Sequence, residues 1–129
     1  MTSFLDPILR TDPASFALAN DRHGRVVAGT LLTAFDSSSR RRGLLGRDSL
    51  PEDSALIIAP SNAIHTFFMR FAIDVAFLSK TGRVLKTCSA VPPWRIAGAW
   101  GGFAVVELPA GALARCDTRR GDTLRITTN

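Results

Sequence analysis

The segment AIHTFFMRFAIDVAFLSKTGR, residues 63–83, constrains the fold of this chain more than any other stretch. It is an apolar run interrupted by His65, Arg70 and Asp74, and it ends in a Lys-Thr-Gly turn. In an extended strand, alternate side chains point to opposite faces of the sheet. If residues 64–78 form one strand, its odd positions form a buried face on which His65 is the only polar residue. The other residues of this face are Phe67, Met69, Phe71, Ile73, Val75 and Phe77.

The polar residues of this run allow two interpretations. Arg70 and Asp74 share the even face, but four residues of straight strand hold them about 13 Å apart, too far for an ion pair. Because a buried charge without a partner is costly, we expect a bend near residues 71–72. The bend would bring His65 and the two charged residues to one end of the sheet, as a binding site or as a structural polar network. His65 itself is either a buried neutral imidazole with its hydrogen bonds satisfied or a ligand contact.

Short apolar segments separated by turn residues predict a mainly β fold. Two short helices are expected, one over residues 40–45 capped from residues 36–39 and ended by Gly46, the other over residues 109–116. Many short strands with one or two short helices are typical of an antiparallel sandwich or a distorted barrel. The strands are predicted at residues 15–20, 25–33, 55–59, 64–71, 73–79, 83–91, 103–108 and 123–128.

Length and composition narrow the class of protein. A chain of 129 residues has the length of a single domain. No apolar run approaches the roughly 20 residues that cross a bilayer, and the first residues lack a signal peptide, so we expect a cytoplasmic protein without a membrane partner. Cys88 and Cys116 lack metal-binding spacing with the two histidines, and no metal or other cofactor is predicted. The net charge of +5 favours anionic partners.

Several short motifs occur in a characteristic order along the chain. They are Ile64-His65-Thr66, Met69-Arg70-Phe71, Ile73-Asp74-Val75, Arg42-Gly43-Leu44-Leu45-Gly46-Arg47, Pro93-Trp94-Arg95, Glu107-Leu108-Pro109-Ala110-Gly111 and Gly121-Asp122. This set resembles domain-of-unknown-function family 192, a family of small prokaryotic domains without an established activity. The resemblance covers about residues 25–128 and leaves 1–24 as an N-terminal extension or a first strand packed on the domain. It implies a β-rich, sandwich-like fold and no particular reaction.

Two positions depart from the pattern of this family. Ala72 stands where members commonly have proline, and a proline would suit a bend or a sheet edge because it donates no ladder hydrogen bond. Ser61 stands where many members have a cysteine, four residues before His65. A thiol-dependent role, or a Cys/His metal site, is therefore not expected of this chain.

The favoured hypothesis is a small non-catalytic binding module with a polar pocket for a small anionic molecule or a peptide. Arginine side chains in the pocket would favour a carboxylate or a phosphate. Trp94 and Trp100 would either wall the pocket or anchor the glycine-rich loop on the core. No oligomeric state is predicted. The candidate ligand-binding residues are His65, Thr66, Arg70, Asp74, Trp94 and Arg95.

Two alternative functions stay open. A hydrolase-like or acid–base enzyme would use His65 and Asp74, with Ser61 as a nucleophile. No G-x-S-x-G elbow surrounds Ser61, so no catalytic residue is assigned. The arginines within residues 40–47 would contact the phosphates of a nucleic acid. Because no aromatic residues are interleaved with these charges, nucleic acid is the weaker hypothesis.

Overall fold

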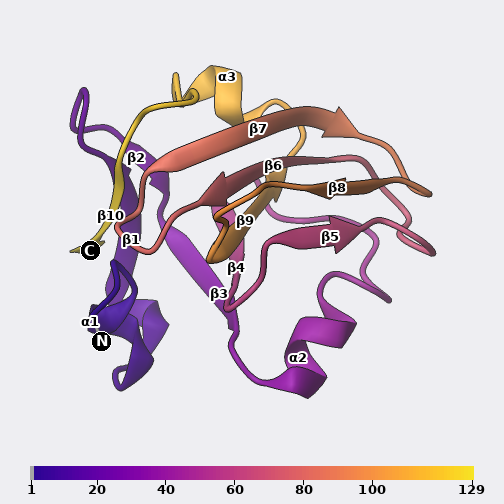
Figure 1. Cartoon of the computed structure of the whole chain (residues 1–129), viewed down its shortest axis with the longest axis horizontal. Coiled ribbons are helices and arrows are strands. Elements are labelled where there is room, and N and C mark those ends of the chain that lie inside the picture. The colour runs from indigo at the N-terminus through magenta and orange to yellow at the C-terminus, as the bar shows by residue number, and fades with distance from the viewer. Residues whose placement is uncertain (1) are drawn as a thin grey trace.

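The protein folds into three β-sheets with short helices at their margins (Figure 1), as a computed structural model of residues 2–129 shows. The predicted mainly β class is confirmed, and the sheets of the described residues form no closed barrel. No helix in residues 2–129 is long and apolar enough to span a membrane. The elements are α1 Asp6–Leu9, the 3₁₀ helix η1 Pro13–Ser15, β1 Phe16–Asn20, β2 Val26–Ala28, β3 Thr30–Ala34, α2 Ser37–Arg42, β4 Ser54–Ile58, β5 Ala63–His65, β6 Ile73–Leu78, β7 Val84–Val91, β8 Ile96–Gly98, β9 Ala104–Pro109, α3 Ala112–Arg115 and β10 Leu124–Thr128.

A five-stranded sheet of order β3-β4-β9-β6-β7 forms the centre of the molecule. Every residue of β4, β6 and β9 is buried, because these strands are covered on both faces. Alternate residues of β9 point to opposite faces, so Val106 belongs to a first core and Val105 to a second. This double burial explains why the segments ALII and AVV are continuously apolar rather than alternating.

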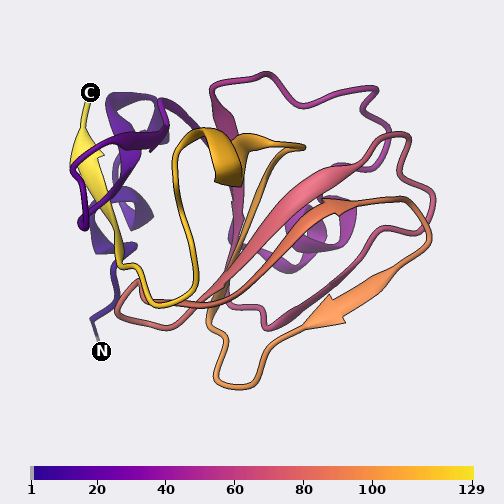
Figure 2. The same cartoon turned by 90° about the horizontal axis from the view of Figure 1, so that it is seen from above.

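The two faces of this sheet are covered by different elements. The first core lies against the three-stranded sheet of order β10-β1-β2 and against α3, through Leu18, Leu113 and Leu124. The second core is closed by the segment after α2 and by the β5–β8 pair, through Leu44 and Ile64. Figure 2 shows the β10-β1-β2 sheet on one side of the molecule and β8 on the other.

The strand predicted over residues 25–33 is divided between two sheets. β2 pairs with β1 in an antiparallel hairpin, whereas β3 pairs in parallel with β4. Gly29 lies at the division, where its N–H donates to the backbone oxygen of Asp53. A side chain at Gly29 would place its Cβ 2.3 Å from a carboxylate oxygen of Asp53, so the glycine permits this close approach.

Both predicted helices occur, with shifted boundaries. α2 begins earlier than expected because Asp36 and Ser39 form a capping box, and it ends at Gly43 instead of Gly46. Gly43 has a φ of 47°, which glycine adopts without a steric penalty. The second helix was expected to begin at Pro109, but Pro109 is the last residue of β9 and pairs with Ile73. α3 covers only Ala112–Arg115.

The run over residues 64–78 contains two strands, but the first is β5, Ala63–His65, and not the predicted strand over residues 64–71. β5 pairs with β8, the chain turns away after His65, and β6 then enters the central sheet. The predicted single buried face is therefore wrong: His65 is exposed, and Ala76 and Leu78 of the opposite face are buried. Ala72 lies just before β6 and outside the ladder, as expected for a position at a bend.

Candidate functional site

The carboxyl group of Glu107 is buried in the middle of the central sheet. Glu107 lies on β9, pairs with Leu56 of β4 and Val75 of β6, and shares the face of Val105 toward the second core. It is 4% exposed, and its Oε2 is buried without a hydrogen-bond partner. Burial raises the pKa of this carboxyl from 4.5 to about 7, because an ionised group is disfavoured in an apolar environment.

A cavity of about 400 Å³ lies over Glu107. This volume is within the range of sites for small molecules. Its walls come from α2 and the turn after it, from the end of β4, and from the segment around β5. Ser61 and His65 add polar groups to the wall, and the Ser61 hydroxyl donates to the backbone oxygen of Ala63 at 2.9 Å. The apolar lining is formed by Leu44, Leu45, Ile58, Ala63, Ile64 and Met69.

Three consecutive arginines of α2 also line this cavity. Arg40 donates to the backbone oxygen of Phe35 at 2.7 Å, and Arg41 donates to that of Ser37 at 3.5 Å. Both bonds lie within or next to the helix, whose last turn favours positive charge. The Arg42 side chain makes no hydrogen bond within residues 2–129, and none of the three arginines forms an ion pair there. The wall is therefore positively charged and open to an anion, while nucleic-acid binding stays an untested prediction.

His65 and Arg70 lie at the surface. The His65 side chain lines the cavity and its ring centroid is 5.1 Å from that of Phe67, so the interpretation as a buried imidazole is wrong. Arg70 is exposed and donates to the carboxylate of Asp48 at 2.8 Å. An exposed ion pair of this kind adds little to stability.

Asp74 lies on the opposite face of the central sheet from Glu107. Its two carboxylate oxygens accept hydrogen bonds from the backbone N–H groups of Ala90, Gly111 and Leu113, at 2.8 to 3.1 Å. These bonds join β6 to the end of β7 and to the start of α3. The structure thus does not bring Asp74 together with His65 and Arg70: in the part of the chain that is described, no hydrogen bond or ion pair joins any two of them.

Thr66, Trp94 and Arg95 do come together. The Thr66 hydroxyl donates to the backbone oxygen of Pro92 at 2.7 Å and accepts from the N–H of Arg95 at 2.9 Å. The Thr66 backbone oxygen accepts from the N–H of Trp94, and its N–H donates to the backbone oxygen of Arg95. Because Thr66 is fully buried, its role here is to hold the loop that precedes β8.

The two tryptophans do not anchor the glycine-rich loop on the core. Trp94 is 57% exposed and Trp100 is 98% exposed. Trp100 lies outside the residues that line the cavity over Glu107. Of the two alternatives for these side chains, packing onto the core is therefore wrong.

Glu107 was not among the residues proposed from sequence, where it appeared only as part of a family motif. A signal was nevertheless present, because it is the only acid in the apolar segment FAVVELP. In a strand buried on both faces, an acidic residue has no solvent to face. Within residues 2–129, no group of three or more His, Cys, Asp or Glu residues is arranged to hold a metal ion.

Comparison with known proteins identifies the family. The profile of DUF192, described as "Uncharacterized ACR", matches residues 19–126. No curated protein matches the chain. A solved protein of unknown function from Novosphingobium aromaticivorans DSM 12444 has 20% identity and a TM-score of 0.73, over 85% of this chain and 82% of that one. A "putative transcription regulator" from Sinorhizobium meliloti 1021 has 22% identity and a TM-score of 0.75, over 85% and 90%. These two likenesses concern the fold alone, whereas the profile match shows that the chain belongs to the DUF192 family.

Proposed function

We propose that this protein binds a small amphipathic molecule with an acidic group in the cavity over Glu107. The observation that carries the proposal is the Oε2 atom of Glu107. This atom is buried and has no hydrogen-bond partner, and Glu107 is one of the residues that line the cavity. Buried polar atoms in folded proteins nearly always have a partner. A bound molecule with a polar group at this point would supply it.

The lining supports a particular ligand chemistry. The apolar walls suit an aliphatic or aromatic body. Below about pH 7 the Glu107 carboxyl is protonated, since burial raises its pKa to about 7, and it can then donate to a carbonyl as well as accept from a hydroxyl. Arg42 would pair with a carboxylate or phosphate at the other end of the molecule. Of the pocket residues proposed from sequence, His65 alone lines this cavity.

The test is a panel of carboxylates and phosphates with apolar bodies, together with their uncharged amide or ester analogues. We expect at least one acidic compound to raise the melting temperature of the wild type, and its uncharged analogue to raise it less. Calorimetric titration of the Arg42→Gln variant should give about tenfold weaker affinity, because one charged contact is lost. Arg120→Gln makes the same charge change at an exposed position outside this cavity, and its affinity should match the wild type.

A Glu107→Leu variant tests the carboxyl itself. Leucine has a similar size and suits the apolar surroundings, so we expect the variant to fold and to bind the same compound about tenfold more weakly. Circular dichroism would check its fold. The proposal fails if no acidic compound stabilises the wild type. It also fails if the Arg42 and Glu107 variants bind the compound as tightly as the wild type and the Arg120 variant do.

One observation favours a second function, acid–base catalysis. A carboxyl with a pKa near 7 in a cavity can release and take up a proton at neutral pH. Glu107 would take the place that the sequence-based alternative gave to Asp74. Any compound that binds should be incubated with the wild type and recovered for mass spectrometry. Conversion by the wild type that Glu107→Gln abolishes would support catalysis, and recovery of the unchanged compound would exclude turnover of that compound.

A further inference from the structure

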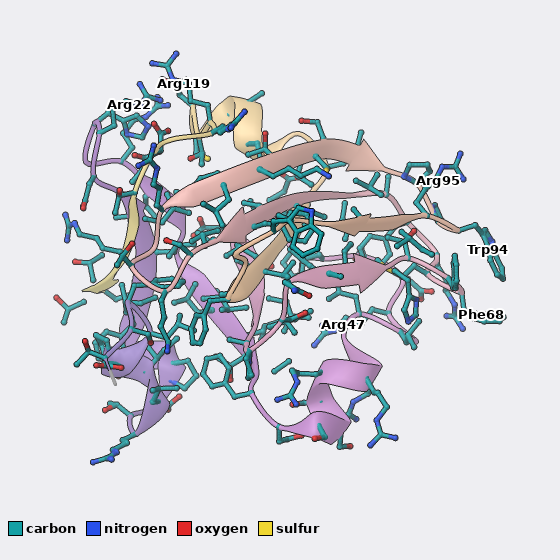
Figure 3. All side chains as sticks on the ribbon, in the orientation of Figure 1. Arg22, Arg47, Phe68, Trp94, Arg95 and Arg119 are labelled. Carbon is teal, nitrogen blue, oxygen red and sulfur yellow. The ribbon has the colours of Figure 1, made fainter. Side chains whose placement is uncertain are left out.

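Two large aromatic side chains project into solvent from one end of the molecule. Phe68 is 71% exposed and Trp94 is 57% exposed. Their ring centroids are 4.7 Å apart in an edge-to-face arrangement, although they belong to different loops. Figure 3 shows both side chains at the same end, pointing away from the body of the protein. We call this pair the aromatic tip.

The aromatic tip is held in an unfavourable backbone conformation. Phe68 has a φ of 64° and Trp94 a φ of 70°, in the left-handed region that bulky residues rarely adopt. Buried Thr66 maintains both turns, because its backbone oxygen accepts from the N–H groups of Met69 and Trp94. Burial in the core does not compensate for this backbone strain, because both rings remain largely exposed to water. Strained residues of this kind cluster at functional sites.

The two loops that carry the aromatic tip contain basic residues and no acidic residue of their own. Residues 66–72 and 92–95, which form the two loops at this end, contain Arg70 and Arg95 and no Asp or Glu. Arg95 lies beside Trp94 (Figure 3) and forms no ion pair within the described residues. Arg70 is paired with Asp48 from outside these segments. This end therefore attracts an anionic surface, as the net charge of +5 also does.

We infer that the aromatic tip docks this protein on membrane surfaces that contain anionic phospholipids. Tryptophan favours the headgroup level of a bilayer, phenylalanine can bury its apolar ring at the boundary with the acyl chains, and basic residues beside them are attracted to anionic lipids. A projecting pair suits a flat membrane better than a peptide, which needs a groove. The inference does not depend on the cavity over Glu107. It departs from the sequence-based expectation of no membrane partner, which considered only spanning segments.

The first test uses tryptophan fluorescence, because the chain has only two tryptophans. Trp100→Phe leaves Trp94 as the reporter, and its emission should shift to the blue when vesicles of mixed phosphatidylglycerol and phosphatidylcholine are added. Trp94→Phe leaves Trp100, which lies on another loop, and its emission should stay unchanged. Pure phosphatidylcholine vesicles should give a smaller shift of Trp94, because the electrostatic attraction is missing.

Co-sedimentation with the same vesicles gives the affinity. Phe68→Ala and Trp94→Ala should each weaken binding to anionic vesicles by about tenfold, whereas Trp100→Ala removes a more exposed tryptophan and should leave binding unchanged. Arg95→Gln should weaken binding to anionic vesicles only, and added salt should do the same. All four substituted side chains are exposed, so thermal melts should confirm that the variants fold.

Three outcomes would overturn the inference. The first is that the wild type does not sediment with anionic vesicles at low salt. The second is that Trp100→Ala weakens binding as much as Trp94→Ala, which would indicate non-specific adsorption. The third is that the wild type forms a dimer without vesicles in analytical ultracentrifugation and Trp94→Ala makes it a monomer. In that case a second copy of the chain, not a membrane, would cover the aromatic tip.

Discussion

Replacing Glu107 by glutamine is expected to stabilise the protein by roughly 3 kcal/mol at about pH 8, and to have little effect below about pH 4. Burial raises the pKa of Glu107 from 4.5 to about 7. Between these two values, the folded protein holds a proton that the unfolded chain has released. The free energy of unfolding of the wild type therefore falls as the pH rises, by about 1.4 kcal/mol per pH unit. Glutamine has nearly the same shape and carries no charge, so this loss is absent from the variant.

Denaturant unfolding of both proteins at a series of pH values checks this expectation. The difference in free energy should grow between about pH 4.5 and pH 7 and then level off. Glu52→Gln is the matched control, because Glu52 is exposed and pairs with Arg115 at the surface. Its difference from the wild type should stay within about 1 kcal/mol across the series. A stability difference for Glu107→Gln that does not change with pH would show that the carboxyl is not shielded from water.

The largest loss of stability is expected for Asp74→Ala, about 3–5 kcal/mol. The Asp74 carboxylate accepts three backbone hydrogen bonds, from Ala90, Gly111 and Leu113. Alanine would leave three N–H groups without a partner in a part-buried or buried setting, and each unsatisfied group costs about 1–3 kcal/mol. The melting temperature should fall by roughly 10 °C or more. Asp74→Asn should lie between the wild type and alanine, because its one carbonyl oxygen can keep part of these bonds.

Asp48→Ala makes the same substitution at an exposed position, where only the surface pair with Arg70 is lost. We expect a change of less than about 1 kcal/mol. Equal stabilities of the Asp74→Ala and Asp48→Ala variants would contradict the structural role of Asp74. A binding role for that carboxylate would then have to be considered again.

Much of the fold is local enough to be predicted from the order of residues. The apolar segments around β4, β6 and β9 indicate buried strands, Lys80-Thr81-Gly82 indicates the turn between β6 and β7, and Asp36 caps a helix as expected. Helix boundaries were less accurate. Gly43 and Gly46 are equally suitable ends by composition, and which one ends α2 depends on where the next segment packs.

Alternation could not predict where the first strand of residues 64–78 ends, which is at His65 and not near the bend expected at residues 71–72. A continuous strand and two strands joined by a turn have the same pattern of apolar residues. What separates them is the set of bonds that Thr66 makes with the loop around Trp94, almost thirty residues away in sequence. These bonds turn the chain out of line and leave His65 on the cavity side, with Asp74 on the other face of the sheet.

The sequence by itself determined the family, the mainly β class, and an acid in the middle of an apolar strand. Only the tertiary structure decided the surroundings of that acid. Glu107 is unpaired because β4 and β6 flank it with Leu56 and Val75, and because α2 and the segment around β5 enclose a cavity over it rather than filling the space. Local residue preferences act within a strand or a turn. The surroundings of a buried carboxyl depend instead on segments distant in sequence, which meet only when the chain folds.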